Sequence, residues 1–264
     1  MTDPLPFDPR RFRYAAAHYL EGRPAYAERL IALVGQLTGL DGKSRVLDLG
    51  CGPGQLARAF APLCGEVLGV DPEPEMLRIA RQESIKATGR IRFIEGSSFE
   101  LDPGLGPFRL VVIGRAFHWM DRPATLALLD RMIEPGGALA LFEDDHPEVP
   151  ENAWRAETQN LVERYTQSDP VRRLHKAADF LHHEAVLLDS RFNRLERIGV
   201  IERRQVATSR IVGRALSMSS TSPAHLGAKV SDLERELTEL LARLAPDGRL
   251  TEVVESQALI TRRG

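Results

Sequence analysis

The sequence predicts an α/β fold of the doubly wound, Rossmann-like type. Three observations lead to this prediction: an apolar strand that runs into a turn with three glycines, a helical pattern after that turn, and a second apolar strand that ends in an aspartate. Strand and helix patterns then continue to alternate along the chain. Such alternation is typical of a parallel sheet covered by helices, and a glycine-rich first turn is typical of a nucleotide-type cofactor pocket.

The glycine turn lies in Arg45–Gly54, which reads R-V-L-D-L-G-C-G-P-G. Gly50, Gly52 and Gly54 allow left-handed backbone angles and a close approach of the backbone to a ligand. The next segment, Gln55–Leu63, carries an apolar stripe at helical spacing and a proline near its end. It therefore predicts a helix whose N-terminus faces the turn.

The second strand, Glu66–Val70, ends at Asp71, where a doubly wound fold places the acid that accepts the ribose hydroxyls. A dinucleotide fold favours G-x-G-x-x-G, but this chain spaces its glycines as G-x-G-x-G. It also carries Asp48, whose carboxylate would repel a pyrophosphate and suit a ligand with ammonium and sulfonium groups. The pattern favours S-adenosylmethionine over NAD.

Val46–Gly54 matches the first motif of the class I S-adenosylmethionine-dependent methyltransferases almost letter for letter. The resemblance is specific over residues 45–142 and faint beyond them. It implies a seven-stranded mixed sheet whose last strand pairs antiparallel. It also implies that the expected helical segment before the first strand folds over the cofactor.

The stretch Tyr19-x-x-x-Arg23-Pro24-x-Tyr26 resembles a signature of a subgroup similar to trans-aconitate methyltransferase. In the functional interpretation, Tyr19 and Arg23 contact the cofactor, and the Arg23 guanidinium binds its methionine carboxylate. In the alternative interpretation, the tyrosines only pack in helices and Arg23 is solvated.

Further cofactor contacts are expected after the next strands. Pro72 is expected to begin a helix, and Met76 either borders the adenine or lies in the core. After the third strand, the family usually carries an acid that accepts a hydrogen bond from the adenine amino group, and this sequence departs from that pattern. Ser97, Ser98 and Phe99 are the candidates to contact the adenine ring in place of that acid. In the alternative interpretation, they form an ordinary Ser-rich loop.

The fourth strand is followed by Arg115, a further candidate cofactor contact, and by A-F-H-W at residues 116–119. The subgroup carries A-F-H-W at this place, and loops at the carboxyl ends of such strands line the ligand crevice. His118 is the candidate catalytic base, and in the alternative interpretation it only orients a neighbour through a hydrogen bond. Phe117 and Trp119 are candidate walls of the acceptor site. The acidic stretch after the fifth strand contains His146, which is a further candidate contact of the acceptor. In the alternative interpretation, this stretch is only a solvated loop.

The remaining chain predicts a helical insertion at 151–190 that caps the active site, and then a strand at Glu196–Val206. Ser231-x-x-Glu234 predicts a capping box at the start of an amphipathic helix, which a final strand at Glu252–Thr261 follows. His175, His182 and His183 do not have metal-ligand spacing, so no metal is expected. The predicted division is a helical segment at 1–44, the cofactor-binding core at 45–150, the cap at 151–190, and the rest of the sheet and its helices at 191–264.

Composition narrows the function further. The 264 residues carry a formal net charge of −2, with no long basic stretch, so a small-molecule acceptor is expected rather than a nucleic acid. Neither a signal peptide nor a membrane span is expected, and the protein is predicted to be cytoplasmic. The two cysteines suggest neither a disulfide scaffold nor a metal cluster.

The function predicted from the sequence is methyl transfer from S-adenosylmethionine to a small molecule. One alternative is a protein that binds S-adenosylmethionine or S-adenosylhomocysteine without acceptor chemistry, and another is a nicotinamide-dependent oxidoreductase, which shares the ribose acid. The identity of the acceptor and the oligomeric state stay open.

Overall fold

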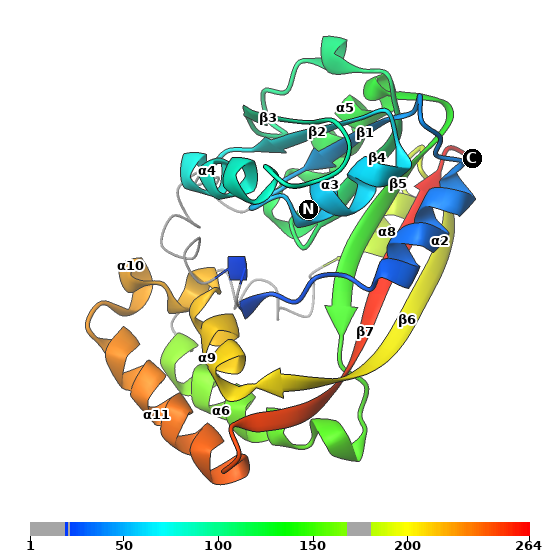
Figure 1. Cartoon of the computed structure of the whole chain (residues 1–264). Coiled ribbons are helices and arrows are strands. Elements are labelled where there is room, and N and C mark those ends of the chain that lie inside the picture. The colour runs from blue at the N-terminus through cyan, green and yellow to red at the C-terminus, as the bar shows by residue number, and fades with distance from the viewer. Residues whose placement is uncertain (1–18, 21, 168–180) are drawn as a thin grey trace.

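A seven-stranded sheet runs through the computed structural model, which describes residues 19, 20, 22–167 and 181–264 (Figure 1). The spatial order of the strands is β3-β2-β1-β4-β5-β7-β6. The predicted α/β, Rossmann-like fold with a mixed sheet is confirmed. The strands are β1 (Arg45–Leu49), β2 (Glu66–Asp71), β3 (Ile91–Glu95), β4 (Phe108–Gly114), β5 (Ile133–Asp145), β6 (Arg194–Ala207) and β7 (Arg249–Arg262).

The chain winds outward from the middle of the sheet in two directions. It passes from β1 to β2 and β3 on one side, and then returns to β4 and β5 on the other, and these strands are all parallel. Strand order therefore reverses between β1 and β4, which is where open α/β sheets bind ligands at the carboxyl ends of their strands. β7 lies antiparallel between β5 and β6.

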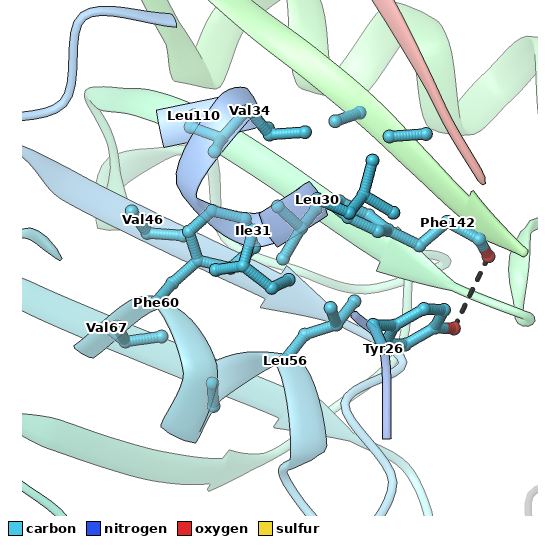
Figure 2. Packing of buried hydrophobic residues seen from close by; sticks show 14 of the residues in the cluster. Tyr26, Leu30, Ile31, Val34, Val46, Leu56, Phe60, Val67, Leu110 and Phe142 are labelled. Atoms are coloured by element: carbon cyan, nitrogen blue, oxygen red, sulfur yellow. Dashed lines mark hydrogen bonds between the residues drawn. The ribbon is translucent and has the colours of Figure 1, made fainter. Parts of the chain in front are cut away.

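Helices bury the apolar side chains on both faces of the sheet. On one face, α2 (Glu28–Thr38) and α3 (Gln55–Phe60) pack Leu30, Val34 and Phe60 against strand residues. Figure 2 shows this packing, in which the Tyr26 hydroxyl reaches the Phe142 carbonyl at 3.5 Å. On the other face, α5 (Arg122–Met132) and α8 (His183–Leu188) share a second cluster with β4 and β5.

Two predicted boundaries before β5 differ in the structure. Pro72 does not begin a helix; α4 (Pro74–Glu83) begins two residues later, because the Glu73 side chain accepts the Glu75 N–H as its N-cap. The stretch Glu134-Pro135-Gly136-Gly137, whose sequence is typical of a sharp turn, lies inside β5. There the register against β4 shifts between Phe108 and Leu110, which makes the turn a bulge of a continuous strand.

Within residues 19, 20, 22–167 and 181–264, four helices form a second layer, which we call the cap. They are α6 (Trp154–Thr166), α9 (Thr208–Leu216), α10 (Pro223–Leu226) and α11 (Lys229–Leu244). Trp154, Ile211 and Leu237 are members of their shared apolar cluster. The capping box is wrong, because α11 begins at Lys229 and Ser231 lies inside it. Extending the helix toward its N-terminus brings Val230 against the apolar cluster of the cap.

An arm, residues 202–207 of β6 and 249–254 of β7, joins α9, α10 and α11 of the cap to the sheet, whereas residues 146–153 join α6 to β5. β5 pairs with β7 only as far as Asp145–Glu255, so the arm continues as a two-stranded ribbon (Figure 1). The predicted cap comprised residues 151–190, but the cap of the structure contains α9, α10 and α11 from residues 191–264 as well as α6. In contrast, α8 packs Leu187 on the sheet, and His175 lies outside the described residues.

Candidate functional site

A cavity of about 880 Å³ lies where strand order reverses, between the carboxyl ends of the strands and the cap. This volume lies near the upper end of the range of ligand pockets, about 300–1,000 Å³. The structure brings most of the predicted site residues into its lining: Tyr19, Arg23, Gly50, Gly52, Asp71, Pro72, Met76, Ser97, Ser98, Phe99, Arg115, Phe117, His118, Trp119 and His146.

The glycine turn has the left-handed backbone that its sequence predicted. Gly50 has φ +71°, and a Cβ there would lie 2.8 Å from the Ala116 Cβ, so a larger residue does not fit. Gly52 has φ +51°, lines the cavity, and has no atom within 4 Å of an added Cβ. The space in front of Gly52 is therefore open for a ligand that approaches the backbone closely.

Asp71 is held in place at the end of β2 by two backbone donors. Its Oδ2 accepts the Gly52 N–H at 2.8 Å, and its Oδ1 accepts the Glu73 N–H at 2.9 Å. Burial raises the pKa of Asp71 to about 6, against the lowering effect of these two hydrogen bonds. Each carboxylate oxygen keeps a further lone pair that can accept a hydrogen bond from a ligand.

Two predicted cofactor residues do not line the cavity. Asp48 is only 1% exposed, and its carboxylate accepts the Ala57 N–H of α3 at 2.9 Å. Its expected contact with the ammonium group of a ligand is therefore wrong; the carboxylate instead caps the first turn of α3, and burial raises its pKa to about 7. Gly54 is needed for packing, since a Cβ there would lie 2.9 Å from the Phe93 ring.

The segment that contains the tyrosine–arginine signature crosses between the sheet and the cap. The Arg23 guanidinium lies 5.8 Å from the centre of the Tyr19 ring and donates from Nε to Ser217 Oγ at 3.2 Å. Burial, followed by the positive charges of Arg115 and Arg214, lowers the pKa of Arg23. Arg23 is half-buried, so it is not the freely solvated side chain of the alternative interpretation.

Arg115 takes a left-handed backbone conformation, φ +55°, directly after β4. Such a conformation is strained for a residue with a side chain and is typical of functional sites. Its guanidinium stacks 4.3 Å from the centre of the Tyr26 ring, donates to the Pro24 carbonyl and forms an ion pair with Asp144. The acidic stretch at the end of β5 is thus partly buried and paired rather than fully solvated.

One end of the cavity is lined by Met76 and the loop after β3. Met76 is 2% exposed, so its side chain is both core and cavity wall. Ser97 is buried, and its hydroxyl donates to Glu100 at 3.3 Å. Phe99 is 48% exposed and lies on the rim.

The A-F-H-W stretch forms the short helix η3 (Phe117–Trp119) beside the cavity. The His118 ring packs 4.7 Å from the Trp119 ring and stacks 6.4 Å from His183, measured between ring centres. The His183 ring also meets Phe117 edge-on, and Arg122 Nη1 lies 3.4 Å from His183 Nδ1. Sequence reasoning considered His183 only as a metal ligand, because its nearness to His118 depends on how α8 folds back.

Sequence reasoning missed a charged cluster on the cap side of the cavity, which we call the cationic cluster. At its centre is the Glu252 carboxylate of the arm, whose side chain is 0% exposed. Three guanidiniums and an imidazole surround it: Arg214 at 2.5 Å, Arg204 at 2.8 Å, His146 at 3.0 Å and Arg155 at 3.6 Å. Burial alone would raise the pKa of Glu252, but hydrogen bonds from His146 and Arg214 hold it well below its usual range.

The described part of the chain also bears on metals and membranes. Among these residues, no group of three or more His, Cys, Asp or Glu side chains is arranged to hold a metal ion. Within the same residues, no helix combines the length and the apolar character that a membrane span requires.

Comparisons with known proteins point to one kind of domain. A family model described as a methyltransferase domain matches residues 46–137. An uncharacterised methyltransferase of Mycobacterium tuberculosis is 27% identical over 228 residues, which span 86% of this chain and 84% of the relative.

Solved structures agree with the fold. A SAM-dependent methyltransferase of Thiobacillus denitrificans, in complex with S-adenosyl-L-homocysteine, superposes with a TM-score of 0.53 at 17% identity over 96% of this chain and 98% of the other. A SAM-dependent methyltransferase of Geobacter sulfurreducens, also in complex with S-adenosyl-L-homocysteine, has a TM-score of 0.53 at 18% identity over 97% and 99%.

Proposed function

This chain is a class I S-adenosylmethionine-dependent methyltransferase, and we propose that its cavity holds the cofactor against the glycine turn and passes the methyl group to a small-molecule acceptor on the cap side. The observation that carries the proposal is the arrangement of Asp71 and Gly52. An oriented carboxylate at the end of β2 lies beside an open space in front of a left-handed glycine turn.

The ribose of the cofactor is assigned to Asp71. Its two oxygens are each fixed by one backbone N–H and have lone pairs left for the two ribose hydroxyls. With a pKa of about 6, the carboxylate is mostly ionised at pH 7, which strengthens such hydrogen bonds. Pro72 and Met76 line the cavity next to it, and Ser97, Ser98 and Phe99 form the neighbouring wall where the adenine ring would lie.

The amino acid part of the cofactor is assigned to the segment between the sheet and the cap. Arg23 presents a guanidinium to the cavity, and among the described residues it has no carboxylate within ion-pair distance. The cofactor's methionine carboxylate would supply that charge, and Tyr19 packs beside the same guanidinium. Arg115 is already paired with Asp144, so its role is to fix the shape of this end of the cavity.

The acceptor is assigned to the space bordered by Phe117, Trp119 and His146. When bound, S-adenosylmethionine supplies a methyl carbon that an acceptor O, N or C atom attacks in line, while S-adenosylhomocysteine leaves with the bonding electron pair. The chain's task is then to hold the nucleophile in line and to exclude water. His118 is the general base where the acceptor arrives protonated.

A small molecule is favoured over a nucleic acid as the acceptor. The net charge of the chain is −2, whereas nucleic-acid binding relies on a basic surface. The positive charges found at the site line a cavity rather than an open face, which suits an acceptor small enough to enter it.

The experiment is a calorimetric titration with S-adenosylhomocysteine and, separately, with NAD. We expect Asp71→Asn to weaken S-adenosylhomocysteine binding about 10- to 100-fold, because charge-assisted hydrogen bonds to the ribose are lost. Asp102→Asn is the matched control, since Asp102 also accepts a backbone N–H, from Gly104 at 2.8 Å, but is exposed and lies outside the cavity lining. Preferential binding of NAD would contradict the proposal.

Methyl transfer in a screen of small-molecule acceptors tests the role of His118. His118→Ala should bind S-adenosylhomocysteine like the wild type and lose about 10²-fold in turnover with a protonated acceptor. Full turnover by this variant would remove His118 from the mechanism.

A further inference from the structure

The cationic cluster has more positive charge than its one carboxylate neutralises. Arg155, Arg204 and Arg214 all lie within 3.6 Å of Glu252, and together these four side chains leave two positive charges in excess before His146 is counted. Asp145 is the further carboxylate that acts on Arg155, but it is exposed and outside the cavity lining. Partly buried charges of one sign in excess are costly unless a ligand compensates them.

The excess charge faces the cavity. Arg155 and Arg214 both line it, with side chains only 20% and 18% exposed, and His146 lines it beside them. Arg155 makes the weakest of the contacts with Glu252, at 3.6 Å, so its guanidinium N–H groups are the least committed of the three. Glu252 thus holds the arginines in place while neutralising only part of their charge.

We propose that Arg155 and Arg214, held by Glu252 and flanked by His146, form an oxyanion subsite that selects acceptors carrying a carboxylate or phosphate group. Guanidinium forks match the planar geometry of such oxyanions. An anionic acceptor is also attracted to the positive sulfonium of the bound cofactor. This inference rests on the proposed function, because it names the class of molecule that the acceptor site takes.

The test measures acceptor binding without turnover, on the full-length protein saturated with S-adenosylhomocysteine. The probes are succinate, tricarballylate and glycerol 3-phosphate as oxyanions, with succinamide as the neutral match of succinate. We expect at least one oxyanion to bind, and we expect the Kd of succinamide to be at least about tenfold higher than the Kd of the oxyanion that binds best. A comparison of the carboxylates with the phosphate ester shows whether the subsite prefers a carboxylate or a phosphate group.

Arg155→Met removes the charge and keeps most of the apolar stem. We expect it to raise the Kd of the bound oxyanion about 10- to 100-fold and to leave the Kd of S-adenosylhomocysteine unchanged. Arg155→Lys should recover part of the oxyanion affinity, because the charge returns without the fork. Arg164→Met is the matched control on the same helix, since Arg164 is 66% exposed and pairs with Glu236 outside the cavity lining.

Any of these results would overturn the subsite: succinamide binding as tightly as the oxyanion that binds best, no binding of any oxyanion, or oxyanion affinity unchanged in Arg155→Met. A parallel loss of S-adenosylhomocysteine and oxyanion affinity in that variant would also overturn it, because the cluster would then serve the cofactor. Failure of the proposed function is a separate outcome, namely that the wild-type protein does not bind S-adenosylhomocysteine.

Discussion

Replacing Glu252 by glutamine tests how the cationic cluster stabilises the fold. The substitution keeps the size of the side chain, so it opens no cavity and removes only the charge. The carboxylate is 0% exposed and accepts hydrogen bonds from Arg204 at 2.8 and 3.0 Å and from Arg214 at 2.5 and 3.2 Å. Removing one partner of a buried charge network costs about 3–5 kcal/mol, and here several guanidiniums lose their counter-ion together.

The expected loss of about 3–5 kcal/mol in the free energy of unfolding corresponds to a fall in Tm of roughly 6–20 °C. Urea denaturation at pH 7 measures it. Glu236→Gln is the control: Glu236 also pairs with an arginine, Arg164, but its side chain is 34% exposed, so a loss of no more than about 1 kcal/mol is expected. A Glu252→Gln variant within 1 kcal/mol of the wild type would refute the reasoning.

The pH dependence of this difference has a definite sign. The folded pKa of Glu252 lies below its unfolded value, so its stabilisation is fully present above the unfolded pKa of about 4.3. The advantage of the wild type over Glu252→Gln should therefore be constant near neutral pH and shrink as the pH falls below that value.

Three further predictions concern other parts of the fold. The free energy of unfolding of Asp48→Asn, relative to that of the wild type, should rise as the pH rises from about 4 to about 7. Burial raises the folded pKa of Asp48 to about 7, so ionisation of Asp48 disfavours the folded state of the wild type over this range. Urea titrations would contradict this if the difference between the two proteins did not change with pH. Gly22→Ala should weaken S-adenosylhomocysteine binding measured by calorimetry. The added Cβ would lie 2.5 Å from the Gly213 backbone of α9 and would displace the segment that carries Arg23. An unchanged Kd would argue against that segment covering the cofactor. Phe60→Ala should cost about 3–5 kcal/mol in urea denaturation, since the ring is 0% exposed, and a loss under 1 kcal/mol would contradict the packing described.

The centre of the sheet was predictable because its signals are local. The pattern around β1 and β2 contains the strand, the glycine turn and the acid within a few tens of residues, and Asp71 lies where that pattern placed it. Asp48 is the exception in the same stretch. Its residue type suggested a ligand contact, but the direction of its side chain on β1 brings its carboxylate to the first turn of α3 instead.

The cap side of the cavity was not predictable, since its residues meet only through tertiary structure. Arg155 comes from α6, Arg204 from β6, Arg214 from α9 and Glu252 from β7. Arg204 faces Glu252 only because of the β6–β7 register. No spacing along the chain indicates that these four residues are neighbours. The cluster could therefore not be predicted from the sequence.

The arm has a consequence for how cavities of this kind can diverge between related enzymes. Each residue added to a strand extends it by about 3.4 Å, so two extra residues in both strands of the arm would move α9, α10 and α11 about 7 Å from the sheet while every side chain keeps its face. The connection from β5 to α6 would have to lengthen with them. One extra residue in each strand would instead turn the Arg204–Glu252 pair to the opposite face. Paired insertions in the arm would thus enlarge the acceptor side of the cavity in discrete steps, while Asp71 and the glycine turn keep their places on the sheet.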